Sequence, residues 1–162
     1  MADLPDAATC YELLARMVEK FTTDPIELPP RERPFDRADL IFYGLDHSGA
    51  SFEARVFIDP RGVGSDADYT HRAYAGSFYI LGHGGCFGDV GHCDVPSAED
   101  PFDLRPPHQL EPATRILTVT ESVRGLLERG AEAAKVTVVA KTPGRASNQV
   151  LAFDRVRLAT YA

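Results

Sequence analysis

The chain has 162 residues, of which 44% are hydrophobic and 25% are charged, and its formal net charge is -7 at pH 7. This length and composition are ordinary for one globular domain and exclude wholesale disorder. The acidic balance, with no run of lysine and arginine, argues against nucleic acid as a partner. The first residues carry no secretory signal and no apolar run is long enough to cross a membrane, so we expect a cytoplasmic protein.

The N-terminal residues 1–23 are expected to contain a short amphipathic helix. Within residues 8–21, apolar side chains recur at helical spacing, namely Tyr11, Leu14, Met17, Val18 and Phe21. Residues 24–38 follow, and four prolines between Asp24 and Pro34 favour an extended arm over regular structure. We therefore expect a helix and a proline-rich arm that stand apart from the main body and dock a partner or a second copy of the chain.

Residues 39–162 show the pattern of a β-rich domain. Apolar or alternating runs separated by turn residues predict strands at 40–43, 52–58, 73–81, 115–119, 135–140 and 150–160. One helix is expected late in this body, opened by Thr120 and ended by Gly130. Short strands with turns between them predict a mainly β chain folded as an antiparallel β-sandwich.

The most unusual segment is a loop at residues 82–96, inserted after an apolar run. Residues 82–93 hold five glycines together with two imidazoles and two thiols, those of His83, Cys86, His92 and Cys93. Imidazole and thiolate together suit copper or zinc rather than magnesium or calcium, and the glycines let the backbone bend so that ligands converge. Because adjacent residues of an extended chain point opposite ways, His71 or His108 is expected to complete the ligand set.

Other interpretations of this loop remain open. A contact or disulfide between Cys86 and Cys93 would make the loop purely structural, with its histidines hydrogen-bonded to backbone. A cysteine nucleophile beside a histidine and an aspartate of the same loop is a further alternative. The three cysteines are an odd number, so no complete disulfide framework is implied. A phosphate-binding loop is excluded, because neither the lysine nor the following helix of a P-loop is present.

The order of these pieces resembles the C-terminal β-sandwich domain of tyrosinases and polyphenol oxidases, which is related in shape to the last domain of arthropod haemocyanins. The resemblance covers roughly residues 39–160. It rests on four short stretches, Val56-Phe57-Ile58-Asp59, Tyr74-Ala75-Gly76-Ser77-Phe78, Leu126-Leu127-Glu128 and Val136-Thr137-Val138-Val139. The chain departs from the plant pattern at Glu53-Ala54-Arg55, where that pattern has Lys-Phe-Asp, and in its longer loop.

The resemblance implies a domain that covers, or helps to mature, a type 3 copper site. The histidine-rich four-helix domain that binds the two coppers of that family is not in this sequence, so we do not expect phenol oxidation by the family's chemistry. The expected function is a copper-binding accessory or covering protein for a partner oxidase. One alternative is a small mononuclear copper or zinc enzyme with its site on the same loop, and another is a purely structural or protein-binding β-sandwich, so enzyme status stays open.

Overall fold

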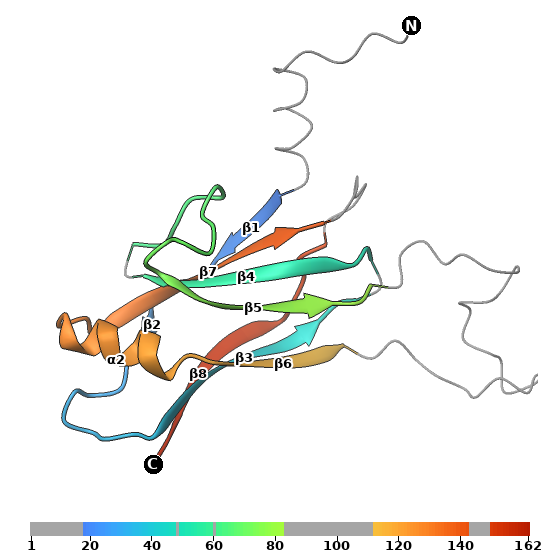
Figure 1. Cartoon of the computed structure of the whole chain (residues 1–162). Coiled ribbons are helices and arrows are strands. Elements are labelled where there is room, and N and C mark those ends of the chain that lie inside the picture. The colour runs from blue at the N-terminus through green and yellow to red at the C-terminus, as the bar shows by residue number, and fades with distance from the viewer. Residues whose placement is uncertain (1–17, 48, 60, 83–111, 143–149) are drawn as a thin grey trace, which may run out of the picture.

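The computed structural model describes residues 18–47, 49–59, 61–82, 112–142 and 150–162. These residues form two antiparallel β-sheets that face each other, with one short helix at one end of the pair (Figure 1). The prediction of a mainly β antiparallel sandwich with a late helix is therefore confirmed. Within the described ranges, no helix is long and apolar enough to cross a membrane.

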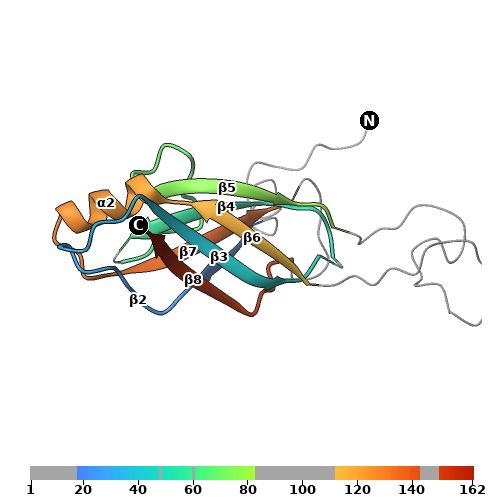
Figure 2. The same cartoon turned by 90° about the horizontal axis from the view of Figure 1, so that it is seen from below.

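The first sheet has five strands and the second has three. In the first, the order is β1 (Val18–Thr22), β7 (Ala133–Lys141), β4 (Phe52–Asp59) and β5 (Tyr74–Ile80), and the short β2 (Ile26–Glu27) also pairs with β7. In the second, β3 (Arg37–Leu45) lies between β6 (Ala113–Thr118) and β8 (Arg155–Tyr161). Figure 2 shows the two layers from below, with the second sheet in front of the first.

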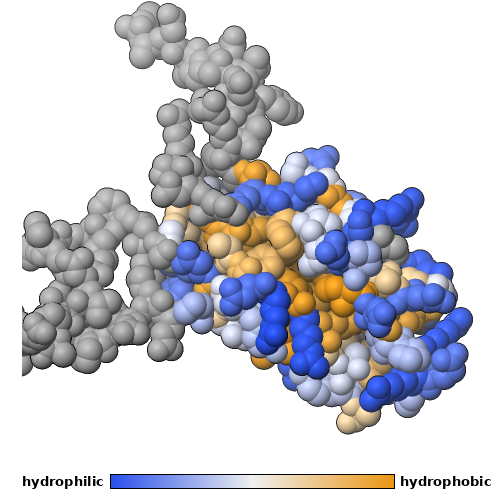
Figure 3. Space-filling view, turned by 180° about the vertical axis from the view of Figure 1, so that it is seen from behind, coloured by the Kyte–Doolittle hydropathy of each residue, from blue (hydrophilic) through white to orange (hydrophobic). Residues whose placement is uncertain are grey.

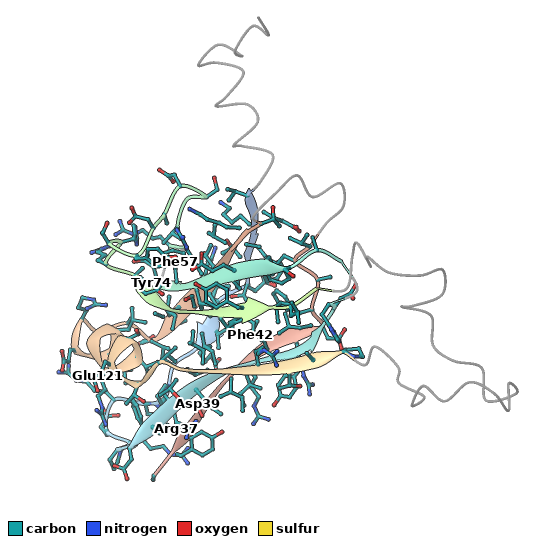
Figure 4. The ribbon with its side chains drawn as sticks, turned by 45° about the vertical axis from the view of Figure 1, so that its right-hand side comes forward. Arg37, Asp39, Phe42, Phe57, Tyr74 and Glu121 are labelled. Atoms are coloured by element: carbon teal, nitrogen blue, oxygen red, sulfur yellow. The ribbon has the colours of Figure 1, made fainter. Side chains whose placement is uncertain are left out.

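The core lies between the sheets because every second residue of each strand points inward. In β4, the inward set is Phe52, Ala54, Val56 and Ile58, all buried. From the other sheet, Phe42 of β3 is fully buried, and its ring centroid lies 5.1 Å from that of Phe78 and 5.8 Å from that of Phe153 (Figure 4). Each of the larger side chains, those of phenylalanine, valine and isoleucine, contributes about 1.5–3 kcal/mol by leaving water.

Helix α2 (Thr120–Glu128) packs against one end of this core. Its buried residues, Val123, Leu126 and Leu127, recur at the three- and four-residue spacing of one helix face. The Thr120 hydroxyl oxygen accepts a hydrogen bond from the Ala38 N–H at 3.0 Å, so it joins the helix to β3 instead of capping its own helix. Gly130, with φ of 78°, ends the helix as expected.

The helix predicted over residues 8–21 is wrong for its last turn, because residues 18–21 belong to β1. Pairing with β7 and packing across the sandwich outweigh the helical spacing of the apolar residues. Phe21 meets Phe153 edge to face, with ring centroids 4.8 Å apart. The Glu19 carboxylate accepts hydrogen bonds from the N–H groups of Val150 and Leu151 at 2.9 and 3.1 Å. The rest of that predicted helix lies outside the described residues.

The proline-rich stretch at residues 24–38 is part of the body, which corrects the expectation of a separate arm. Its first part forms β2, and the Leu28 N–H donates to the Glu132 carbonyl at 2.9 Å. Ile26 and Leu28 pack against the core, where they line a small apolar cavity together with Leu158 of β8. Seen from behind, the surface of the molecule shows a group of apolar residues (Figure 3). The prolines limit the length of β2, and they do not prevent it from pairing.

Candidate functional site

Only one of the predicted metal ligands, His71, is among the described residues. His83, Cys86, His92, Cys93 and His108 lie outside them, so the geometry of that ligand set stays a prediction. The Nδ1 atom of His71 accepts a hydrogen bond from the Ala73 N–H at 3.2 Å, and its ring lies edge-on to Phe57 with centroids 5.9 Å apart. His71 therefore has only its Nε2 atom to offer a metal ion.

The described residues alone do not make a metal site. In the parts of the chain that the structure describes, no group of three or more His, Cys, Asp and Glu side chains is placed to hold an ion. A copper or zinc site would have to take most of its ligands from loop 82–96. The copper prediction therefore depends on the donor chemistry of the sequence.

Residues 61–73 fold over the outer face of the first sheet and build a second, smaller hydrophobic cluster there. Its buried members are Phe57, Ala67, Ala73 and Val139, with Val18, Val63 and Tyr74 packed around them. Figure 4 shows Phe57 and Tyr74 on this outer layer, away from Phe42. Phe57 points outward next to a register shift between β4 and β5. The covering segment carries Tyr69 back over β4.

Tyr69 meets two charged residues of β4, and we call this group the Glu53 cluster: Glu53, Arg55 and Tyr69. Arg55 donates from Nε and Nη2 to one oxygen of Glu53, at 3.1 and 3.0 Å. The Tyr69 hydroxyl donates to the other Glu53 oxygen at 2.6 Å and accepts from Arg55 Nη2 at 2.6 Å. The Arg55 guanidinium also lies 3.8 Å from the centroid of the Tyr69 ring. The three side chains thus fix one another in place.

These contacts lower the pKa of Glu53 and raise the pKa of Tyr69, so both move further from neutral pH. Burial by itself would raise the pKa of Glu53, but hydrogen bonds from Arg55 and Tyr69 and the charge of Arg55 outweigh it, so the net pKa is lowered. The hydrogen bond to Glu53 raises the pKa of Tyr69, and partial burial adds to that effect. A general base or acid needs a pKa near the working pH. The Glu53 cluster is therefore suited to holding and binding, and poorly suited to proton transfer.

Beside the cluster lies a surface pocket of about 500 Å³ with mostly apolar walls. Glu53 pairs in register with Tyr79 of β5 and with Lys141 of β7, so the three side chains share one row of the outer face. Tyr79 is 69% exposed and Leu81 is 77% exposed. A pocket that combines apolar walls with a few fixed polar groups is the usual form of a binding site.

The sequence predicted the strand at residues 52–58 that carries Glu53 and Arg55, and it did not identify these two residues as a site. The available signal was two opposite charges two residues apart in a strand, which share one face. Tyr69 gave no signal, because its place over β4 depends on the path of residues 61–73. The candidate site of the described residues is thus a binding surface on the first sheet, next to the start of loop 82–96.

The comparisons with known proteins agree with the fold. No protein-family model matches the chain, and no curated protein matches it either. It is similar to a recombinantly expressed latent aurone synthase (polyphenol oxidase), with a TM-score of 0.51 and 17% identity, over 88% of this chain and 24% of that one. For the latent aurone synthase from its natural source, the TM-score is 0.51 and the identity 16%, over 90% of this chain and 24% of that one.

At this level of identity the likeness concerns the fold alone. The β-sandwich of this chain is similar in fold to the matching part of these polyphenol oxidase chains. It spans about a quarter (24%) of the length of the polyphenol oxidase chains that it matches.

Proposed function

We propose that this chain is a covering or accessory protein for a partner oxidase of the polyphenol oxidase class, and that its loop 82–96 binds copper. The observation that carries the proposal is the match of 88% of the chain to about a quarter (24%) of an enzyme whose description calls it latent. We infer that a domain with the fold of such a part acts beside a catalytic part. This step from fold to function is an analogy.

The copper part of the proposal rests on the donor set of the loop. His83, Cys86, His92 and Cys93 supply borderline and soft ligands within a short glycine-rich stretch, with His108 or the Nε2 of His71 available to join them. The loop leaves the end of β5 and the chain returns at β6, and these two strands lie where the sheets meet. Copper held there would be positioned at one end of the sandwich, and zinc is the alternative metal for the same ligands.

Metal analysis of purified protein tests the copper proposal. The untagged protein is reconstituted with Cu(I) or Zn(II), dialysed and assayed by mass spectrometry beside His83→Ala and Cys86→Ala. We expect about one equivalent of copper in the parent and at least a tenfold weaker affinity in each variant, because each loses a ligand. His47→Ala, a histidine outside the loop, is the matched control and should bind as the parent does. A parent chain that retains no metal after reconstitution refutes this part.

The partner surface proposed here is the row of exposed side chains beside the loop. Tyr79 and Leu81, at 69% and 77% exposed, are the most open large apolar side chains among the described residues, and they lie next to Gly82. Exposed apolar residues of this kind are typical of protein contacts. The N-terminal helix and the proline-rich arm were the sequence-based choice for docking a partner or a second copy. Because residues 24–38 pack against the body, we move the proposed contact to Tyr79 and Leu81.

Inhibition of a partner oxidase tests the covering role. The chain is mixed with the isolated catalytic domain of a polyphenol oxidase from the same source, and oxidation of a diphenol is followed. We expect the rate to fall in proportion to complex formation, and Leu81→Asp to weaken this effect at least tenfold, because it places a charge in an apolar contact. Ile116→Asp, which changes a 57% exposed residue on β6, is the control. An unchanged rate at saturating chain would count against a covering role.

A further inference from the structure

The segment 61–73 and helix α2 both lie at the end of the sandwich opposite the C-terminal end of β5 (Figure 1). Residues from this segment, from the end of α2 and from β4 line a second pocket. Its volume is about 360 Å³, and three arginines from separate parts of the chain line it. Arg61 follows β4, Arg72 precedes β5, and Arg129 follows α2. We call it the arginine pocket. Three arginines around one hollow are unexpected in a chain with a net charge of -7, and the side chains of Arg61 and Arg72 are 80% and 68% exposed.

The carboxylate that lines this pocket, Asp59, does not neutralise it. Arg72 Nη2 lies 3.5 Å from Asp59 Oδ2 and Arg61 Nε lies 3.9 Å from Asp59 Oδ1. Charge-assisted hydrogen bonds are usually 2.7–2.9 Å long. The pair of Arg37 and Asp39, at 2.8 Å, shows what an engaged arginine looks like in this fold. With three positive charges and one negative charge among its lining residues, the pocket keeps a net positive charge and unused guanidinium donors.

The backbone fixes the positions from which the three arginines reach the pocket. The Arg61 N–H donates to Asp59 Oδ1 at 2.9 Å, and the Arg129 N–H donates to the Leu126 carbonyl at 3.1 Å. Beside Arg72, the Ala73 carbonyl accepts from the Ile58 N–H at 2.9 Å, which ties this stretch to β4. A ligand would therefore order the arginine side chains alone, and no backbone rearrangement would be needed.

The remaining walls are apolar and indicate what the rest of a ligand is like. Ile58, Ala73, Leu126 and Ala131 line the same pocket as the arginines. An anion made only of oxygen atoms would leave these walls uncovered. A ligand with a compact apolar body and one anionic head would cover them and also use the guanidinium donors, since planar guanidinium groups match carboxylate and phosphate oxygens.

We propose that the arginine pocket binds a small organic anion, whose carboxylate or phosphate is held by Arg61, Arg72 and Arg129 and whose apolar body rests on Leu126 and Ala131. None of the residues that line this pocket belongs to loop 82–96, and the contact at Tyr79 and Leu81 lies at the opposite end of β5 from Arg72 and Ala73. This binding site can therefore be present even if the chain covers no oxidase, and its loss would leave the copper proposal unchanged.

Titration of the whole chain with three small probes tests this inference by two-dimensional ¹H–¹⁵N NMR at constant ionic strength. Benzoate and phenyl phosphate supply the two anionic heads on one apolar body, and benzylammonium supplies the opposite charge. We expect the amides of Ala73, Gly130 and Ala131 to shift saturably with the anions, with a Kd on the order of 1 mM, as befits ligands of this size. The anion with the lower Kd shows whether the pocket prefers a carboxylate or a phosphate group. Absence of saturation, or equal shifts with benzylammonium, overturns the proposal.

Variants distinguish anion binding in the arginine pocket from a general attraction of anions to positively charged side chains. The double variant Arg72→Gln, Arg129→Gln should weaken anion binding at least tenfold, and Arg157→Gln, which removes an exposed charge from β8, should not. Ala131→Leu leaves the charge unchanged and fills the apolar floor, so it should weaken benzoate more than inorganic phosphate. Thermal unfolding of each variant checks that it is folded. Arg157→Gln that weakens anion binding as much as the double variant would contradict specific binding in the arginine pocket. The same holds if Ala131→Leu leaves benzoate binding unchanged, or if the pocket binds an acidic peptide and not benzoate.

Discussion

Two arginine–glutamate pairs of this protein have similar geometry in different surroundings. Arg55 and Glu53 are 3.0 Å apart with side chains 11% and 13% exposed, whereas Arg124 and Glu121 are 2.8 Å apart and 43% and 84% exposed. Exposed pairs contribute little, because water and salt screen them. Breaking a buried pair leaves one charge desolvated without a partner, which costs far more. Burial, and not distance, should therefore decide which pair matters for stability.

Replacing Glu53 by glutamine is expected to lower the free energy of unfolding by about 2 kcal/mol at neutral pH, because Arg55 loses its partner. The matched change Glu121→Gln should cost less than about 0.5 kcal/mol. Because folding lowers the pKa of Glu53 below its ordinary 4.5, its contribution is complete above that pH and is lost as the pH falls through the lowered value. Urea unfolding at pH 7 and pH 3.5 measures both effects. A Glu53→Gln deficit as large at pH 3.5 as at pH 7 would contradict this account.

Glu19 makes a second residue-scale prediction, since its carboxylate serves the N–H groups of Val150 and Leu151, both buried residues. Glu19→Ala should cost about 2 kcal/mol, because two donors lose their acceptor. Glu19→Gln keeps one acceptor oxygen and should cost roughly half as much. Urea unfolding gives the two energies, and amide hydrogen exchange at Val150 and Leu151 should speed up most in the alanine variant. Identical stability of all three chains would mean that β1 is not anchored in this way.

At the scale of elements, regular alternation and turn chemistry could be predicted, and pairing partners could not. The strand at residues 52–58 and the helix between Thr120 and Gly130 follow from short-range patterns, and both were predicted. β1 was misassigned because Val18 and Phe21 are three residues apart, a spacing that places them on one face of a helix but on opposite faces of a strand. In β1, Val18 packs on the outer cluster with Phe57, whereas Phe21 meets Phe153. The strand at residues 26–27 was missed because its stability comes from β7, which is more than a hundred residues away in the sequence.

For the candidate site, too, the sequence predicted short-range features and missed those that depend on the fold. The Glu53 cluster could be predicted only as far as two charges on one strand face, because Tyr69 reaches it through the fold of residues 61–73. The arginine pocket gave no signal at all, since Arg61, Arg72 and Arg129 meet only once β4 and α2 are packed. Five of the six predicted metal ligands lie outside the described residues, so the chemistry of the loop remains a statement about residue types.

The contact between the two sheets depends on one glycine of β5. Gly76 has φ of 142°, and a Cβ atom there would lie 2.9 Å from Leu117 Cδ1 of β6. Gly76→Ala should therefore cost about 2 to 3 kcal/mol, from backbone strain and from overpacking between the sheets. Gly130 has φ of 78° with nothing within 4 Å of the Cβ position, so Gly130→Ala should cost only about 1 kcal/mol. Thermal unfolding of both variants measures the difference. Equal losses would mean that Leu117 moves aside freely.

For the molecule as a whole, the sandwich separates its two proposed activities. The exposed Tyr79 and Leu81 and the start of loop 82–96 at Gly82 lie at the end of β5. The arginine pocket is lined by residues around the end of α2, and α2 lies at the opposite end of the sandwich (Figure 1). Among the described residues, the core between the sheets includes Leu40, Phe42, Val56 and Val138, which lie on the strands. Stability should therefore depend on the strands, and the chemistry at each end should be removable without unfolding the protein.

Replacement of residues 84–110 by a short glycine–serine linker tests that separation. The linker joins β5 to β6, which lie side by side where the sheets meet, and shortening a long connection changes its closure entropy by only about 1 kcal/mol. We expect a folded chain that unfolds in one step within a few degrees of the parent, binds benzoate in the arginine pocket and retains no copper, because His83 alone remains of the loop ligands. Circular dichroism, NMR titration and metal analysis measure the three properties. A shortened chain that fails to fold would show that residues 84–110 contribute to the core, and one that still binds copper would place the metal elsewhere.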